Sequence, residues 1–260
     1  MEEAIVMYPT PAIGHLISMV ELAKLILTHH PSLTIHILIA PQPYNAGSTA
    51  PYIAAVSAST PSITFHSLPN VTLPPTSSPN HETLTFELLR LNNPNLHQSL
   101  LSISKTSTVH ALIMDFFCFH ALSVAANLNI PGYYFFTSGA GSLAYFLYLS
   151  TMHRSTSKSF KDLDADTLLE IPGLPPIPSS DTPKPLLDRT DEAYKCFLDC
   201  SISMAKSAGI IVNTFESLEP RVLKAISDGL CVPDGPTPSI FCIGPLIATG
   251  RAEVAAMSTA

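Results

Sequence analysis

Short apolar runs alternate with stretches of helical periodicity through the first half of the chain. Apolar runs that predict strands lie at Ala4–Tyr8, Leu33–Ala40, Ile63–Leu68, Val109–Met114 and Tyr133–Phe136. Apolar residues recur at near-helical spacing at His15–Leu27, around Ser48–Ser57, at His81–Ser104 with a break near Asn93-Pro94, and at Phe117–Leu128. Continuous apolar strands that alternate with helices are typical of a parallel sheet covered on both faces. We therefore expect an α/β fold with a doubly wound, Rossmann-like parallel sheet.

The second half of the chain begins with a stretch in which prolines forbid long helices. This stretch, Ser155–Arg189, is expected to be a surface excursion. The pattern then predicts a helix at Glu192–Ser207, a strand at Gly209–Asn213, a helix at Glu216–Ser227 and a strand at Ile240–Ile243. The tail Thr249–Ala260 is weakly patterned and is interpreted as a linker.

The stretch Ile130–Leu149 carries no charge over about the length that spans a bilayer. Pro131-Gly132 and Thr137-Ser138-Gly139 interrupt it, so a buried strand, a turn and a core helix over Ser138–Ser150 explain it better than a membrane span. The turn resembles a nucleophile elbow only loosely, because Phe136 stands where that motif needs glycine. A helix N-cap at Thr137 or Ser138 is the favoured interpretation.

Composition narrows the classes of partner. Only 13% of the residues are charged and the formal net charge is −7, so no basic cluster is present to neutralise a run of phosphates, and nucleic-acid binding is excluded. The five cysteines lack zinc-ligand spacing and are expected to be buried thiols. The acidic start Met1-Glu2-Glu3 is unlike a signal peptide, which predicts a cytoplasmic protein.

The loop after the first predicted strand does not match the common nucleotide-binding motifs. Residues 9–15 read PTPAIGH, with one glycine where a dinucleotide fingerprint needs three, and they lack the Gly-Lys-Ser/Thr ending of a P-loop. A nicotinamide-dependent oxidoreductase and an ATP-binding protein are therefore both set aside.

Two titratable residues follow predicted parallel strands at their carboxyl ends, where ligands bind in such sheets. His15 opens the first helix, and Asp115 follows the strand that ends at Met114. A carboxylate that binds one imidazole nitrogen leaves the other nitrogen free to act as a base toward an alcohol or phenol. The alternative is that both residues only cap the helices that follow them.

Six segments together resemble one known family. They are IVMYPTPAIGHLISMVELAKLIL (5–27), ALIMDFFC (111–118), IPGYYFFTSGAGSLA (130–144), IPGLPPIPSSDTP (171–183), GIIVNTFESLEP (209–220) and FCIGPLI (241–247). In this order they resemble the N-terminal half of plant family 1 UDP-sugar glycosyltransferases, most closely the flavonoid and anthocyanidin O-glucosyltransferase group.

The resemblance implies the Rossmann-like N-terminal acceptor domain of a GT-B glycosyltransferase at residues 1–246, with the start of an interdomain linker at 247–260. The C-terminal UDP-sugar-binding domain is expected to be absent, and the chain has no tryptophan to form the family's Trp- and His-rich box. The site residues that the resemblance implies are His15 as catalytic base, Asp115 as its partner, Ala12, Ile13, Phe116 and Phe117 at the acceptor, and Gly14 and Thr137 at the donor.

The implied reaction is inverting glycosyl transfer, in which UDP-glucose or a related UDP-sugar is the co-substrate and no further cofactor or metal takes part. The implied acceptor is a flavonoid or another small phenolic. Two hypotheses remain open: a glycosyltransferase that is inactive until a C-terminal half completes it, and a non-catalytic small-molecule-binding or regulatory remnant of such an enzyme.

Overall fold

The computed structural model describes residues 1–41, 48–74, 80–164 and 166–248, so the predicted linker at 249–260 lies outside the described residues. Residue contacts divide the chain into two compact units. Of the described residues, unit 1 comprises 1–41, 48–74, 84–135 and 246–248, and unit 2 comprises 80–83, 136–164 and 166–245.

Unit 1 is built on parallel strands, in the places that the apolar runs predicted. They are β1 (Glu2–Tyr8), β2 (Thr34–Ile39), β3 (Ile63–Ser67), β4 (Ser107–Asp115) and β5 (Gly132–Phe136). They lie side by side in the order β3-β2-β1-β4-β5, with β1 at the centre. The predicted α/β fold with a parallel sheet is therefore confirmed.

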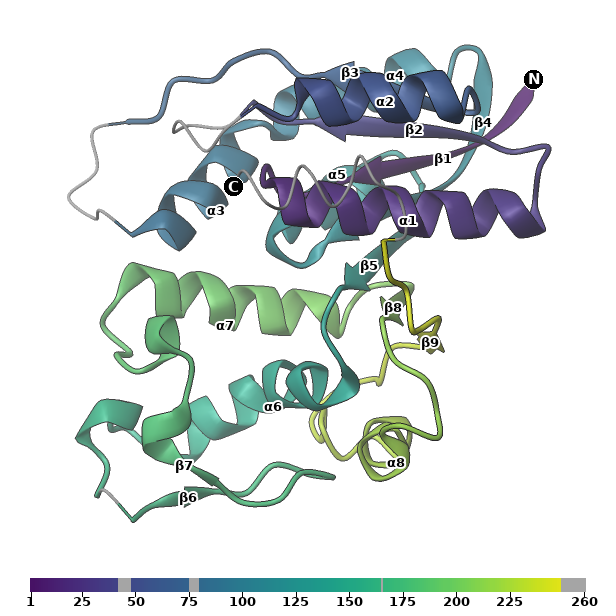
Figure 1. Ribbon diagram of the computed structural model, residues 1–260. Helices are drawn as coiled ribbons and strands as arrows, with labels where there is room; N and C mark the ends of the chain where they lie inside the picture. Colours follow the sequence, from purple (N-terminus) through teal and green to yellow (C-terminus); the bar gives the residue numbers. More distant parts are fainter. Residues whose placement is uncertain (42–47, 75–79, 165, 249–260) are drawn as a thin grey trace. The chain divides into compact units, whose positions relative to one another are not determined.

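Helices connect these strands. They are α1 (Ile13–His29), α2 (Ala50–Ser59), α3 (His81–Leu91), α4 (Asn93–Ile103) and α5 (Ala121–Asn127). Right-handed crossovers place α1 and α2 on one face of the sheet and α4 and α5, which pack against each other, on the opposite face. Figure 1 shows α1 and α2 running alongside the strands.

One predicted helix is wrong in its first turn. The helix expected over Phe117–Leu128 is a 3₁₀ turn, η1 (Phe116–Cys118), followed by the shorter helix α5. The Asp115 side chain accepts a hydrogen bond from the Phe117 backbone N–H, and this contact holds the chain in the tight turn.

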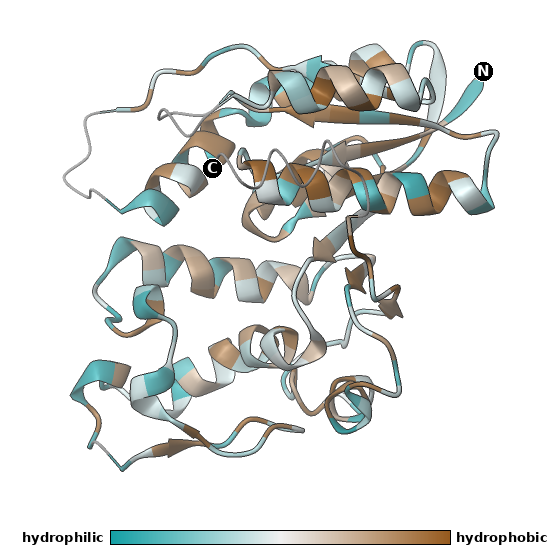
Figure 2. Cartoon of the chain, viewed as in Figure 1, coloured by the Kyte–Doolittle hydropathy of each residue, from teal (hydrophilic) through white to brown (hydrophobic). Residues whose placement is uncertain are grey.

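The core of unit 1 lies on the central strands. Val6 and Met7 of β1, Ile37 of β2 and Leu112 and Met114 of β4 are fully buried. Burial of such apolar side chains contributes about 25 cal/mol per Å² and is the main source of stability for a sheet of this kind. Figure 2 shows these strands in hydrophobic colours.

The order of the strands reverses between β1 and β4. Tyr8, the last residue of β1, is in register with Met114, the next-to-last residue of β4. The chain leaves β1 toward one face of the sheet and leaves β4 toward the other, so the two following loops separate at this point. His15 and Asp115 follow these neighbouring strands.

Unit 2 contains helices α6 (Ala140–Ser155), α7 (Glu192–Met204) and α8 (Pro220–Ser227) and the parallel strand pair β8 (Gly209–Val212) and β9 (Ile240–Cys242). Helix α6 packs against α7 and α8 (Figure 1). The proline-rich excursion forms the antiparallel pair β6 (Leu168–Leu169) and β7 (Ile177–Pro178) and the 3₁₀ turns η2 (Phe160–Asp162), η3 (Ser179–Asp181) and η4 (Lys184–Leu186).

Two helix starts in unit 2 differ from the prediction. Helix α6 begins at Ala140, with Gly139 as its N-cap, so neither Thr137 nor Ser138 caps it. Helix α8 begins at Pro220, because proline fits the first turn of a helix and the preceding Glu219 side chain is bound elsewhere.

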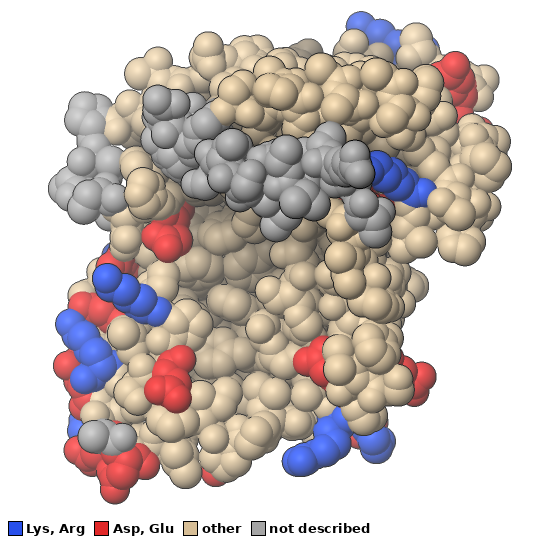
Figure 3. All heavy atoms as spheres, viewed as in Figure 1, with Lys and Arg blue, Asp and Glu red and all other residues tan. Residues whose placement is uncertain are grey.

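The described part of the chain holds no helix that is both long and apolar enough to cross a membrane. The uncharged stretch instead forms β5 and most of α6, as predicted. Cys118, Cys200 and Cys231 are buried as expected. Cys196 is only half-buried and Cys242 on β9 is exposed, so the expectation is not met for these two. Figure 3 shows few charged side chains on the visible face, in line with the low charged fraction of 13%.

Candidate active site

Unit 1 brings the two predicted catalytic residues into contact. His15 is the third residue of α1, and Asp115 is the last residue of β4. His15 Nδ1 lies 2.8 Å from Asp115 Oδ2, across 100 residues of sequence. Asp115 does cap the following turn, η1, and the hydrogen bond to His15 is an additional contact of the same carboxylate.

Burial differs sharply between the two partners. The Asp115 side chain is 1% exposed, whereas 30% of the His15 side chain is exposed. A carboxylate only accepts hydrogen bonds, so Nδ1 carries the proton that the pair shares. The other ring nitrogen, Nε2, is then available to take a proton from a ligand.

The pKa of His15 is set by opposing effects. Burial lowers the pKa of His15, but the negative charge of Asp115 and the hydrogen bond to it together outweigh burial and raise that pKa above its ordinary value. Above this raised pKa the imidazole is neutral and can accept a proton.

An aromatic ring from the turn after β4 contacts the histidine. The Phe117 ring lies edge-on to His15, with ring centroids 5.7 Å apart, and it also contacts Phe116 and Phe86 at 5.3 and 5.1 Å. Phe116 is 8% exposed and Phe86 is 1% exposed, whereas Phe117 is half-buried. Phe117, one of the two phenylalanines predicted at the acceptor, therefore contacts the His15 ring.

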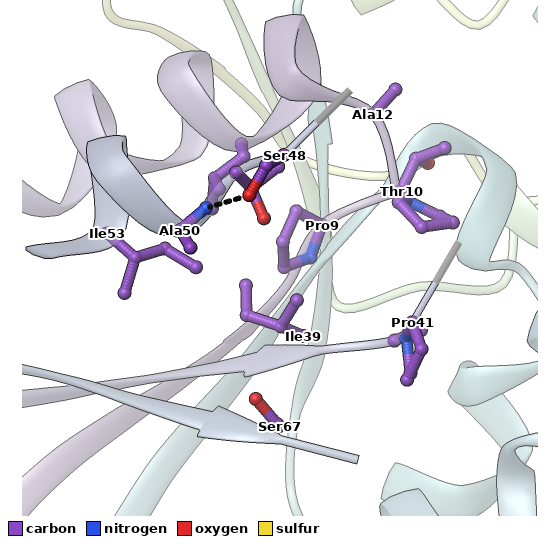
Figure 4. A pocket seen from close by; sticks show the side chains of 13 residues that line it. Pro9, Thr10, Ala12, Ile39, Pro41, Ser48, Ala50, Ile53 and Ser67 are labelled. Carbon is purple, nitrogen blue, oxygen red and sulfur yellow. Dashed lines mark hydrogen bonds between the residues drawn. The ribbon is translucent and has the colours of Figure 1, made fainter. Parts of the chain in front are cut away.

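A cavity of about 420 Å³ lies beside the loop between β1 and α1, on the side of β2 and β3. Pro9, Thr10 and Ala12 of the β1–α1 loop line it, together with residues at the ends of β2 and β3 and the start of α2 (Figure 4). Ala12, predicted at the acceptor, borders this cavity, while Ile13 begins α1 and is half-buried.

Gly14, predicted at the donor, is exposed in the first turn of α1. A Cβ atom added there would have no neighbour within 4 Å among the described residues, so packing in unit 1 does not require glycine at this position. Ala12, the N-cap of α1, has no side-chain acceptor for the N–H groups of the first turn.

Thr137, the other predicted donor residue, belongs to unit 2 and is half-buried directly after β5. The helix that follows it is held by Glu219. The Glu219 carboxylate accepts hydrogen bonds from the backbone N–H groups of Ala140 and Gly141, at 2.7 and 2.8 Å, and from the Thr214 hydroxyl at 2.5 Å. A Cβ atom at Gly139 would lie 2.8 Å from Glu219 Oε2, so a larger residue there would displace the carboxylate from its present position.

Two residues near these sites were not predicted. Thr10 donates a hydrogen bond to Asp115 Oδ1 at 2.5 Å, and Glu219 replaces the expected N-cap of α6. The only signal for Thr10 in the sequence is its position, one residue beyond the proline that ends a buried strand. Nothing in the spacing links Glu219 to a helix that begins 79 residues earlier.

We expect Asp115→Asn to lower the pKa of His15 below that of an ordinary histidine, because burial then acts without the opposing charge. An NMR titration of the histidine ring in the 260-residue chain measures this. Glu3→Gln, which removes the exposed carboxylate that binds His110, is the matched control and leaves the His15 titration unchanged. An unchanged pKa in Asp115→Asn would contradict the geometry described above.

We expect Glu219→Ala to lower the free energy of unfolding by about 1–3 kcal/mol, because it leaves three donors unpaired. Burial raises the pKa of Glu219, but these hydrogen bonds outweigh it and lower the pKa, so the stabilisation is present at neutral pH and is lost as the pH falls through the lowered pKa. Urea unfolding measures the difference. Glu216→Ala, on the exposed neighbouring residue, is the control, and equal effects of the two variants would refute the assignment.

Comparison with known proteins identifies relatives but no matching protein-family model. The chain is 51% identical over 247 residues to UDP-glycosyltransferase 88B1 of Stevia rebaudiana, a match that covers 95% of this chain and 53% of the relative. It is 49% identical over 259 residues to anthocyanidin 5,3-O-glucosyltransferase of a Rosa hybrid cultivar, covering 94% of this chain and 53% of the relative.

Comparison with solved structures also finds plant UDP-glycosyltransferases. The structure of Phytolacca americana UGT2 complexed with UDP-2-fluoro-glucose and pterostilbene matches with a TM-score of 0.84 and 30% identity, over 96% of this chain and 56% of that protein. The chain thus spans about half the length of the curated relatives it matches. Sequence and fold together show that the chain belongs to the plant UDP-glycosyltransferase family.

Proposed function

We propose that this chain supplies the acceptor side and the general base of a UDP-sugar-dependent O-glycosyltransferase. The proposed reaction transfers a glucosyl group to a flavonoid or another small phenolic with inversion at the anomeric carbon. The observation that carries the proposal is the 2.8 Å contact between His15 Nδ1 and the buried Asp115 carboxylate. Relatives named for glucosyl transfer to anthocyanidins and to phloretin support the substrate class.

The proposed chemistry is a direct displacement. Nε2 of His15 takes the proton of an acceptor hydroxyl, whose oxygen forms a bond to the anomeric carbon of the sugar. The bond from that carbon to the UDP oxygen breaks, and UDP leaves with the bonding electron pair. Asp115 stabilises the imidazolium that forms, because its carboxylate lies against Nδ1.

The acceptor is proposed to bind beside the Phe117 ring. Phe117 is half-buried and edge-on to His15, so a flat phenolic ring that packs against it would bring a hydroxyl toward the base. Ala12 and Ile13 are proposed to form the neighbouring wall. The buried Phe116 ring packs edge-on against Phe117.

The donor is proposed to contact Gly14 and Thr137. Gly14 supports this assignment because packing within unit 1 does not require a glycine there, so the need for one would come from a ligand that approaches the backbone. In this proposal the UDP-sugar is a co-substrate and no separate cofactor takes part. A cytoplasmic location remains a prediction.

Transfer is best tested on this chain fused to the part of the Stevia relative that it does not match. We expect the fusion to glucosylate a flavonol such as quercetin with UDP-glucose. His15→Ala is expected to lower kcat by about 10²–10⁴-fold, the usual contribution of a general base, and Asp115→Ala somewhat less. Product formation followed by chromatography measures both.

His29→Ala, at the exposed end of α1, is the matched control and is expected to retain full activity. Near-normal turnover in His15→Ala would refute the assignment of the base. A folded fusion that binds quercetin and UDP-glucose without any transfer would instead favour a non-catalytic binding protein.

Gly14→Ala separates ligand contact from folding. We expect the unfolding temperature of the chain to stay the same or to rise slightly, because the position is open and alanine favours helix over glycine. In the fusion, the KM for UDP-glucose is expected to rise while the KM for quercetin changes little. Unchanged donor kinetics would remove Gly14 from the donor site.

A further inference from the structure

The Asp115 carboxylate has a third partner that the proposed mechanism does not use. Oδ1 accepts a hydrogen bond from the Thr10 hydroxyl at 2.5 Å and a longer one from the Phe117 backbone N–H at 3.3 Å, while Oδ2 faces His15. We infer that Thr10 is a positioning residue that holds the carboxylate in the orientation in which Oδ2 meets Nδ1 of His15. The inferred role in catalysis rests on the proposed function, whereas the positioning itself does not.

The orientation of a carboxylate is not fixed by its own side chain. Rotation about the last torsion of aspartate is broad and roughly two-fold, so an unrestrained carboxylate samples many angles. Asp115 is 1% exposed, so its oxygens depend on protein donors. The shortest of these donor contacts is the one from Thr10, which is itself 5% exposed.

Thr10 is suited to this role by the residues beside it. Pro9 and Pro11 have fixed φ angles, and a residue that precedes proline is itself restricted to extended conformations. Threonine is branched at Cβ, which restricts its χ1 angle. The hydroxyl is therefore carried by a stiff backbone segment that leaves β1 directly beside β4.

The surroundings of Thr10 allow its hydroxyl to be tested without crowding the core. Thr10 borders the cavity of about 420 Å³ shown in Figure 4, so a small change in its side chain has space on one side. Valine has the same shape as threonine and lacks the hydroxyl, while serine keeps the hydroxyl and lacks the methyl group. The pair Thr10→Val and Thr10→Ser therefore separates hydrogen bonding from packing.

The orientation of the Asp115 carboxylate affects which ring nitrogen of His15 carries the proton. With Oδ2 held against Nδ1, the neutral ring carries its proton on Nδ1 and leaves Nε2 unprotonated. Without the Thr10 donor, the carboxylate is free to turn away, so the share of rings protonated on Nε2 rises. The pKa of His15 falls at the same time, because burial lowers it and the charge that opposes burial is less well placed.

The test is ¹⁵N NMR of histidine-labelled 260-residue chain, with the His15 signals assigned by their loss in His15→Gln. The ¹⁵N shifts above the pKa report which nitrogen carries the proton. We expect the Nδ1–H form to dominate in the wild type and in Thr10→Ser. Thr10→Val is expected to shift the ring toward the Nε2–H form and to lower the pKa. Thr28→Val, which removes an exposed hydroxyl at the end of α1, is expected to match the wild type.

A wild-type tautomer and pKa in Thr10→Val would overturn the inference, and so would a Thr10→Ser variant that behaves like Thr10→Val. Amide spectra establish that each variant is folded. If Thr10→Val does not fold, the wild-type chain provides the test. A buried Thr10 hydroxyl that donates to a carboxylate exchanges its proton with water slowly. Rapid exchange of this hydroxyl proton would overturn the inference.

The fused glycosyltransferase gives a second readout. Loss of one hydrogen bond to a charged group predicts a kcat about tenfold lower in Thr10→Val, with little change in the KM for either substrate and with activity retained in Thr10→Ser. Because the NMR readout needs no activity, failure of the proposed function leaves the positioning test intact. A kcat in Thr10→Val equal to that of the wild type would remove Thr10 from the reaction.

Discussion

The site in unit 1 depends on one buried carboxylate. Asp115 ends the strand beside the central strand of the sheet, and its two oxygens together bind the Thr10 hydroxyl, the Phe117 backbone N–H and the His15 ring. These groups come from the loop after β1, the turn after β4 and the first turn of α1. A buried acceptor without donors is costly, so the contacts that orient the His15 ring also hold together the loops around the strand ends.

The reversal of strand order explains why these contacts form where they do. Because β1 and β4 are neighbours and their chains leave toward opposite faces, the loops that follow them separate at this point. His15 keeps 30% of its side chain exposed there, while its partner is almost fully buried. A histidine ring that stays partly exposed and a carboxylate that is almost fully buried are both consistent with this one topological feature.

The helices and strands could be predicted because burial of one face of an element produces a periodic pattern of apolar residues in the sequence. The apolar runs of β1, β2 and β4 and the helical spacing of α1 follow directly from which side chains the sheet covers, and His15 and Asp115 were found because each follows such a run. Hydrogen bonds between side chains far apart in the sequence produce no such periodic pattern. Thr10 and Asp115 are 105 residues apart, and Glu219 lies 79 residues after Ala140, so the spacing did not predict the true start of α6. Proline, glycine and a side-chain acceptor decided these helix ends, where hydrophobic periodicity carries no information.

The central claim, that His15 is the base that receives the acceptor proton, is tested most directly by a crystal structure of the chain with quercetin bound. We expect a phenolic hydroxyl oxygen within hydrogen-bond distance of Nε2 of His15, with the flavonoid rings against Phe117 and with Nδ1 still bound to Asp115. A flavonoid bound with no hydroxyl near His15, or a His15 ring turned away from Asp115 in that complex, would contradict the claim.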